Sequence, residues 1–536
     1  MADTGTPPVL PIEFRRYNSY VEDPKWQRKF STIWPAVAGL FVLLALPHLV
    51  RSIRSGRAFS SVWGVTEEFG HARYEAVGTS KSRAMRRGGR GSALRKVEAA
   101  LSRIGAWLYW TLPGIGLNLG QIIIVAAYLL TVVLCIVLKA PLISNSNRAG
   151  FLALAQLTPI FLLATKNSIL CLLLGPGRGY EKLNFLHRWA GRALFVSALV
   201  HGALWIRNHV QYGIEIMGEQ KEQSGIAAFA CLGIIVLSSL RVVRRWAWGL
   251  FFAVHVLVFP AFFITVCYHT IYARPWIYPA LALYGLDLLL RMFKIRIKDA
   301  VLVPIGKQMT LVHIPYATSG WLAGQHVRLR VFFSGRVFEA HPLTIFAAPP
   351  STTCISPSSY PQGVSLGARV SGDWTRALNV YAREAADEIL ADENSSKPIE
   401  AGELKKKHHA NLRVEVPVQV MIDGPYGGSS VDLGQYDSVL LFAGGAGVTF
   451  TLGLLDDIVG RVARRRREGG ERTRRIEFGW CARSTGLLLL FTTSPPSRRP
   501  RSLPHPSTVQ ESSFTSRSTS PVSVTPRLFH PSRTST

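Results

Sequence analysis

The 536-residue chain has few charged residues, and acidic residues are the scarcest of them. Charged side chains make up 18% of it, and 33 Asp and Glu against 61 Lys and Arg give a net charge of +28. Hydrophobic residues make up 48%, which excludes a disordered or collagen-like chain. The basic residues lie beside apolar runs and form no recognisable nucleic-acid-binding module, so no nucleic acid is expected as a partner. The pattern favours a protein of the membrane lipid bilayer.

Cysteine is also scarce, with 6 residues and no Cys-x-x-Cys pair. This excludes a disulfide scaffold, and the thiols are interpreted as small buried hydrophobic groups. Residues 1–20 are polar and lack a cleavable signal pattern.

Seven segments are apolar enough to cross a bilayer, each about 18–25 residues long. They lie near residues 33–50, 113–138, 150–174, 186–206, 226–243, 247–267 and 276–293. The loops richest in Lys and Arg, such as residues 51–103, then fall on one side, which the positive-inside rule assigns to the cytosol. We therefore expect an integral, multi-pass protein of the plasma membrane. Residues 1–32 would lie outside, residues 33–293 would form the transmembrane domain, and everything after Phe293 would be cytosolic.

Histidines recur at one spacing in two of these segments. His187 and His201 lie in the fourth, His255 and His269 lie in the sixth, and 14 residues separate the members of each pair. Fourteen residues of helix cover about 21 Å and return to within about 40° of the same face. One span lies between the two helices, so they run in the same direction and match in depth, His187 with His255 and His201 with His269. This arrangement suits two stacked haems, each with two axial imidazoles.

Two other interpretations of these histidines exist. A single intramembrane histidine is as often a packing residue as a ligand, but two identical spacings favour ligation. One shared metal ion is disfavoured, because histidines so far apart on each helix cannot converge and no carboxylate accompanies them.

The chain changes character after the last span. Residues 301–420 alternate like strands between Gly and Pro turns, and residues 383–410 within them suit a flexible insertion or an exposed helix equally. Residues 438–444 are typical of a buried strand that leads into a Gly-rich turn. Residues 484–536 are dominated by Ser, Thr, Pro and Arg and predict a disordered, low-complexity tail.

The part of the chain after Phe293 contains four short motifs. They are His341-Pro-Leu-Thr-Ile345, Gly372-Asp-Trp-Thr375, Asp423-Gly-Pro-Tyr-Gly427 and Gly444-Gly-Ala-Gly-Val-Thr449. The last lies between a strand and a helix, where glycines and a helix N-terminus favour a dinucleotide phosphate. Arg483 follows a second strand, and it either pairs with a ribose 2′-phosphate, which selects NADPH, or is a solvated strand end.

Taken in order, the paired histidines and these motifs resemble the fungal-type ferric/cupric reductases, in the superfamily that includes the superoxide-producing NADPH oxidases. The resemblance runs from about residue 33 to residue 483. It implies a multi-domain membrane protein with an α-helical transmembrane bundle of about seven helices. A ferredoxin-reductase-like β-barrel FAD domain over residues 294–430 and an incomplete α/β nucleotide-binding domain over residues 437–483 would follow.

The resemblance also implies roles for the motif residues. The flavin would be held by His341, Pro342 and Thr344, and its pyrophosphate would lie near Gly372 and Thr375. The residues that would face NADPH are Gly444, Gly445, Gly447 and Thr449. Leu343 and Phe450 stand where the family usually has Phe and Pro. The family's later strands and its Cys-Gly motif are replaced by residues 484–536, for which a frameshift, a retained intron or a mispredicted gene is the favoured hypothesis.

The expected function is a transmembrane ferric/cupric-chelate reductase. Electrons would move from cytosolic NADPH through FAD and two b-type haems to Fe(III) or Cu(II) outside the cell, and no acid–base catalytic residue is expected. The expected partners are ferric or cupric chelates and an iron-uptake permease or oxidase. One alternative is an NADPH oxidase that produces superoxide. The other is a haem membrane protein that is inactive because its nucleotide domain is incomplete.

Overall fold

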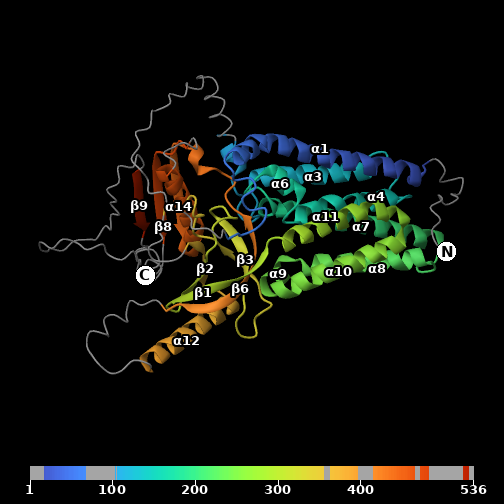
Figure 1. Ribbon diagram of the computed structural model, residues 1–536. Helices are drawn as coiled ribbons and strands as arrows, with labels where there is room; N and C mark the ends of the chain where they lie inside the picture. The colour runs from blue at the N-terminus through green and yellow to red at the C-terminus, as the bar shows by residue number, and fades with distance from the viewer. Residues whose placement is uncertain are drawn as a thin grey trace, which may run out of the picture. The chain divides into compact units, whose positions relative to one another are not determined.

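A computed structural model describes residues 17–67, 103, 105–354, 362–395, 414–464, 471–481 and 523–529. The chain separates into two compact units. The first, of residues 1–47, 83–174 and 179–288, is helical, and the second, of residues 48–82, 175–178 and 289–536, holds the strands (Figure 1).

The helices of the first half follow the apolar segments of the sequence. They are α1 (Ser19–Arg54), α3 (Leu119–Val137), α4 (Asn147–Ala155), α5 (Leu157–Ala164), α6 (Ile169–Leu174), α7 (Tyr180–Tyr212), α8 (Gln220–Ser238), α9 (Arg241–Trp246), α10 (Trp248–His269), the 3-10 turn η2 (Ile271–Ala273) and α11 (Arg274–Met292). Within the described residues, 6 stretches are long and apolar enough to cross a membrane: α1, α3, α4 with α5, α7, α8 and α10. The seventh expected span forms the helix α11, but it carries Arg274, Asp287 and Arg291 and is less apolar than the other six.

The third expected span is not one helix. The chain breaks at Gln156, between α4 and α5, and again after Ala164. Pro159, in the first turn of α5, has no N–H to donate to the carbonyl of Ala155, so the helical hydrogen-bond ladder cannot continue through this point. The side-chain amide of Gln156 forms hydrogen bonds near the break. Its oxygen accepts from the Tyr128 hydroxyl at 3.0 Å, and its nitrogen donates to Ser197 Oγ at 3.3 Å.

The first unit exposes apolar side chains and buries polar ones. Leu44, Leu130 and Leu257 are 68%, 58% and 74% exposed, whereas Arg148 and Gln156 are fully buried. An apolar exterior is what a lipid-embedded bundle needs, and its polar groups are satisfied inside.

The second unit begins with an antiparallel sheet that is nearly closed into a barrel. Its strands are β1 (Ile295–Ile305), β2 (Met309–Pro315), β3 (Gln325–Val331), β4 (His341–Thr344), β5 (Gly363–Arg369) and β6 (Val416–Gly427), in the order β4-β3-β6-β1-β2-β5. A bridge between Ile345 and Leu366 joins the two edges. The expected barrel is thus confirmed. Alternate residues of each strand point inward, as in β3, where Val327, Leu329 and Val331 are fully buried.

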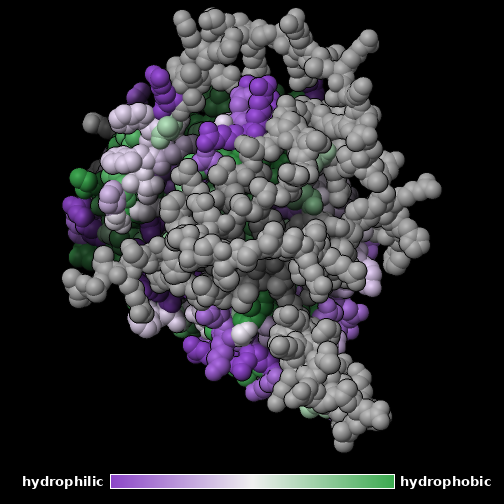
Figure 2. All heavy atoms as spheres, turned by 90° about the vertical axis from the view of Figure 1, so that its left-hand side faces the viewer, coloured by the Kyte–Doolittle hydropathy of each residue, from purple (hydrophilic) through white to green (hydrophobic). Residues whose placement is uncertain are grey.

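The helix α12 (Asp373–Ser395) covers one part of the barrel, with Trp374, Leu378 and Ala382 in the same core. The helical alternative therefore holds for residues 383–395, and most of the remaining segment up to residue 410 lies outside the described residues. Figure 2 shows a face on which hydrophilic side chains, drawn purple, gather in several places.

The nucleotide-binding part is a parallel sheet of β7 (Ser438–Gly444), β8 (Arg475–Cys481) and β9 (Ser523–Phe529), in that order. The 3-10 turn η4 (Gly445–Gly447) and the helix α14 (Val448–Arg464) connect β7 to β8. The strand β9 corrects the expectation of disorder throughout residues 484–536, because it pairs with all seven residues of β8. An open edge of β8 presents unpaired N–H and C=O groups, which an extended segment can satisfy whatever its composition. Arg483 and the rest of the tail lie outside the described residues.

Candidate haem and flavin sites

The first unit brings the four histidines of α7 and α10 together as two pairs. The ring centroids of His187 and His255 are 6.3 Å apart, and those of His201 and His269 are 6.2 Å apart. A metal–imidazole bond of about 2 Å, plus about 1.1 Å from nitrogen to ring centroid, places two imidazoles on opposite sides of one ion at about 6.2 Å. Each pair therefore has the separation that one ion held between two rings requires.

Each of these imidazoles has a hydrogen-bond partner at Nδ1. The partners are Ile160 O for His187 (3.0 Å), Ser146 O for His201 (3.0 Å), Lys221 O for His269 (2.8 Å) and Ser239 Oγ for His255 (3.1 Å). The Ser239 hydroxyl donates to Ile235 O at 2.6 Å, so its oxygen accepts from the ring. A proton fixed on Nδ1 leaves the Nε2 lone pair for a metal. The sequence carries no signal for these partners, because three of them are backbone carbonyls on other parts of the bundle.

Two glycines let neighbouring helices pack directly on the second pair. A Cβ at Gly150 of α4 would lie 3.1 Å from His201 Nδ1, and one at Gly225 of α8 would lie 2.7 Å from His269 Nδ1. Gly233, on the same helix as Gly225, has nothing within 4 Å of that position. The contacts at Gly150 and Gly225 fix where these imidazoles stand.

His209, near the end of α7, does not join these pairs. His209 packs on the Trp205 ring with centroids 3.6 Å apart and contacts Glu222 at 3.2 Å, which is a structural role. Across the described part of the chain, no three His, Cys, Asp or Glu side chains gather into a metal site. The residues present thus fit two bis-imidazole groups better than one polydentate ion.

In the second unit, the first two motifs of the sequence lie together. The His341 ring of β4 stacks on the Trp374 ring of α12, with centroids 4.3 Å apart and an interplanar angle of 24°. Thr375 Oγ1 accepts from the N–H groups of Ser371 and Gly372, at 3.0 Å each, and so closes the turn that begins α12. Gly372 is exposed and has nothing within 4 Å of a Cβ position, which leaves its backbone open to a ligand.

The other two expected flavin residues are also on β4. Pro342 is exposed, and Thr344 pairs in register with His326 of β3. The motif at Asp423 is structural, because its carboxylate accepts from Arg291 and from the Tyr426 hydroxyl, both at 2.6 Å.

The Gly-rich motif forms the turn between β7 and α14. Gly445 has φ +52°, in the left-handed region, and Gly444 and Gly447 have open space at their Cβ positions. The Thr449 hydroxyl donates to Ala446 O at 3.1 Å and so braces the turn from inside. The start of α14 and these open glycines make a surface suited to a phosphate.

Arg369, at the end of β5, lies beside this turn and was missed by sequence reasoning. Its Nη1 would be 3.4 Å from a Cβ at Gly445. No motif marks it, since only the fold of the barrel brings β5 to the turn.

Comparisons with known proteins agree with this arrangement. Residues 149–266 match the family described as "Ferric reductase like transmembrane component", and residues 292–430 match "FAD-binding domain". The chain thus carries a region similar to ferric reductase transmembrane components, followed by an FAD-binding domain. The first match contains all of His187, His201 and His255, and it ends three residues before His269.

Three curated fungal members of the family show how far the likeness reaches. Ferric reductase transmembrane component 3 of Saccharomyces cerevisiae is 25% identical over 56% of this chain and 38% of its own length. The probable cell surface ferric reductase kap2 of Aspergillus oryzae is 27% identical over 63% of this chain and 43% of its own. Ferric reductase transmembrane component 1 of Schizosaccharomyces pombe is 26% identical over 64% of this chain and 60% of its own. The chain thus spans less than two thirds of each of these ferric reductases.

Among solved structures, a ferredoxin NADP+ reductase from Neisseria gonorrhoeae is similar at 12% identity, over 36% of this chain and 61% of its own, with a TM-score of 0.21. That likeness is too distant to support a functional argument. The chain is therefore described from its own residues and its two family matches, as an integral membrane protein with several apolar helices and an FAD-binding domain.

Proposed function

We propose that the protein is a transmembrane reductase of ferric or cupric chelates that uses NADPH, FAD and two b-type haems. The observation that carries this proposal is the pair of bis-imidazole sites, His187 with His255 and His201 with His269, at 6.3 and 6.2 Å. Helices with apolar, exposed outer surfaces carry both sites, so they suit electron transfer across lipid.

The residues of each site would supply the ligands of a bound haem and orient them. His187 and His255 would hold one haem, and His201 and His269 would hold the other. Bound haem supplies reversible one-electron transfer, and bound flavin connects a two-electron hydride donor to it. With two imidazoles as its protein ligands, each haem would serve as an electron carrier and would not bind oxygen or a chelate. The Nδ1 partners hold each ring in orientation and raise its basicity as a ligand.

In the second unit, His341, Pro342 and Thr344 would hold the flavin, and Gly372 and Thr375 would lie at its pyrophosphate. The residues proposed to face the phosphates of NADPH are Gly444, Gly445, Gly447 and Thr449. Arg369 joins them as a cation that can pair with a phosphate. The protein would lie in the plasma membrane, with its N-terminus outside and the flavin domain in the cytosol. An iron-uptake permease or oxidase is the proposed partner.

Haem counting on the purified full chain tests the core of this proposal. We expect two haems per chain, and one haem after either His201→Leu or His269→Leu. His209→Leu is the matched control, since it removes a histidine of the same helix α7 that packs on Trp205 rather than on another imidazole, and it should keep both haems. A chain without haem, or a His201→Leu/His269→Leu double variant that keeps two, would contradict the proposal.

The acceptor requires a second measurement. NADPH-dependent reduction of a ferric chelate by reconstituted protein should be insensitive to superoxide dismutase. Loss of the signal on adding dismutase would favour the NADPH oxidase alternative. Haem that NADPH cannot reduce would favour the inactive haem protein.

A further inference from the structure

The first turns of α1 carry three buried polar side chains in a row. Ser19, Asp23 and Gln27 follow one another at four-residue intervals, and they are 1%, 0% and 4% exposed. Side chains four residues apart lie one above the other on the same face of a helix. All three belong to the first unit, which also contains α4, α7 and α10. Buried polar groups in such a row need hydrogen-bond partners on a neighbouring helix.

Each of the three side chains forms a hydrogen bond with the start of α4. The bonded atoms are Ser19 Oγ with Asn147 Nδ2 (3.0 Å), Asp23 Oδ1 with Arg148 Nε (2.6 Å) and Gln27 Nε2 with Phe151 O (2.9 Å). The middle contact is also an ion pair between two fully buried side chains, Asp23 and Arg148. The first turns of α1 therefore fix the start of α4.

The same stretch of α4 orients a candidate haem ligand. Ser146 comes directly before α4, and its carbonyl oxygen lies 3.0 Å from His201 Nδ1. One turn later, a Cβ at Gly150 would lie 3.1 Å from the same nitrogen. A shift of the start of α4 would change both contacts, so the position of the His201 imidazole depends on α1.

An aromatic cluster extends this support towards the second ligand of the pair. The ring centroid of Tyr20 on α1 lies 6.5 Å from that of Phe151 on α4 and 5.7 Å from that of Tyr272. The Phe151 and Tyr272 centroids are also 5.7 Å apart. Tyr272 belongs to η2 and follows His269 by three residues. The first turns of α1 thus contact segments next to both His201 and His269.

We propose that Ser19, Asp23 and Gln27 are positioning residues of the His201–His269 site. They hold the start of α4 where its backbone orients the His201 ring and keeps the Nδ1 hydrogen bond intact. This inference rests on the proposed function, because it concerns a haem that His201 and His269 would hold.

The other site, His187 with His255, provides an internal reference. Its Nδ1 partners are Ile160 O and Ser239 Oγ, which lie in α5 and directly after α8. A change confined to the contacts between α1 and α4 should therefore alter one site and not the other.

A redox titration of the haem spectrum tests this inference on the full chain in detergent. Dithionite is the reductant, so the measurement requires neither NADPH nor flavin. We expect two one-electron steps for the wild-type chain, and His201→Leu identifies the step of the His201–His269 site by removing it.

The test variant is Ser19→Ala/Gln27→Leu, which removes two hydrogen bonds to α4 and leaves the Asp23–Arg148 pair in place. A weakened Nδ1 hydrogen bond makes an imidazole a weaker donor to Fe(III). The step of the His201–His269 site should therefore move to higher potential, with an about fivefold higher ratio of reduced to oxidised haem at a fixed potential. The other step should stay in place.

Ser31→Ala/Thr32→Ala is the matched control. It also removes two side-chain hydrogen bonds from α1, but these run to carbonyls of α1 itself, at Gln27 and Arg28, and both steps should stay unchanged. Where the test variant does not fold, Ser19→Ala alone should shift the same step by a smaller amount. Ser19→Thr, which keeps a hydroxyl, should not shift it.

Three results would overturn the inference and leave the proposed function standing. They are an unchanged titration in the test variant or in Ser19→Ala, equal shifts of both steps, and the same shift in the control. A wild-type chain without haem would contradict the proposed function and this inference with it.

Discussion

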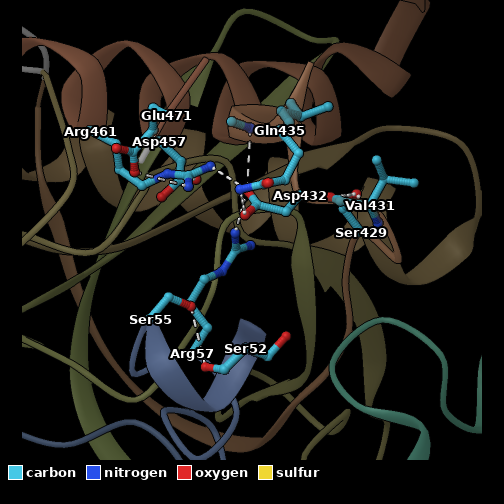
Figure 3. Close-up of polar contacts among 12 residues, drawn as sticks. Ser52, Ser55, Arg57, Ser429, Val431, Asp432, Gln435, Asp457, Arg461 and Glu471 are labelled. Carbon is cyan, nitrogen blue, oxygen red and sulfur yellow. Dashed lines mark hydrogen bonds and ion pairs between the residues drawn. The ribbon is translucent and has the colours of Figure 1, made fainter. Parts of the chain in front are cut away.

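The two units each bury an arginine, but in opposite surroundings. In the bundle, Arg148 is fully buried and pairs with one carboxylate, Asp23, at 2.6 Å. It also donates to the carbonyls of Cys135 and Leu138 at the end of α3. In the second unit, Arg461 has three carboxylate partners, at Asp432, Asp457 and Glu471 (Figure 3). In the bundle, the arginine satisfies buried carbonyls at the end of α3, whereas in the second unit it joins separate segments of one unit.

The two units also differ in where their apolar side chains lie. Leu302 and Leu329 are fully buried in the barrel, whereas Leu257 of α10 is 74% exposed. Burial from water stabilises the barrel, whereas lipid makes a leucine on the bundle surface as favourable as one inside it. Substitutions of one residue type should therefore have unequal costs in the two units.

Arg148→Met should have the largest effect. It leaves Asp23 and two carbonyls buried without a cation, and removing one partner of a buried ion pair costs about 3–5 kcal/mol. Burial and the neighbouring Asp23 raise the pKa of Tyr17 to about 12, so this hydroxyl remains neutral and cannot replace the arginine. The thermal unfolding midpoint in detergent should fall sharply, and Arg207→Met, at an exposed site, should leave it unchanged. Equal midpoints would show that the pair contributes nothing.

Leu302→Ala and Leu257→Ala compare the two kinds of leucine directly. The first opens a cavity in the barrel and should cost about 2–5 kcal/mol, while the second should cost less than about 1 kcal/mol in a lipid-like environment. Unfolding midpoints of both variants in the same detergent measure the difference. Similar losses would mean that Leu257 packs against protein.

Gly225→Ala should weaken haem binding at His201 and His269 only. The added methyl group would lie 2.7 Å from His269 Nδ1, and overpacking of this kind costs about 1–3 kcal/mol. Haem content should fall from two towards one per chain, while Gly233→Ala on the same helix keeps two. Equal haem content in the two variants would refute the role of this contact.

Asp432→Asn should have the smallest effect, and one that depends on pH. Burial opposes ionisation of Asp432, but the Arg461 and Arg57 guanidinium groups outweigh burial and lower its folded-state pKa. Its ion pairs therefore stabilise the fold above the unfolded-state value of about 3.9 and lose this effect as the pH falls further. The variant should lose about 1–2 kcal/mol at pH 7, and this loss should shrink as the pH falls through the folded-state pKa of Asp432. Asp437→Asn, at an exposed pair with Arg472, is the control and should change little at any pH. A loss that persists at low pH would point to packing instead.

Periodicity explains what could be predicted from the sequence. Helical repeat and direction placed His187 opposite His255 and His201 opposite His269, and alternating strands predicted the barrel. The Asp23–Arg148 pair could not be predicted, because 125 residues separate its members and no local pattern marks them. The break at Gln156 was signalled by Pro159, but the apolar run around it suggested one continuous span. Strand β9 was missed because pairing with β8, rather than its own composition, accounts for it.

The hydrogen bonds behind the four imidazoles differ in how mutation can reach them. The Nδ1 atoms of His187, His201 and His269 hydrogen-bond to main-chain oxygens, which every amino acid supplies. Substitutions at residues 160, 146 and 221 therefore leave the acceptor in place. His255 alone depends on a side chain, that of Ser239. Substitutions in the surrounding sequence can therefore accumulate without loss of the hydrogen bonds that orient three of the rings. The orientation of the fourth ring, His255, depends on the residue at position 239.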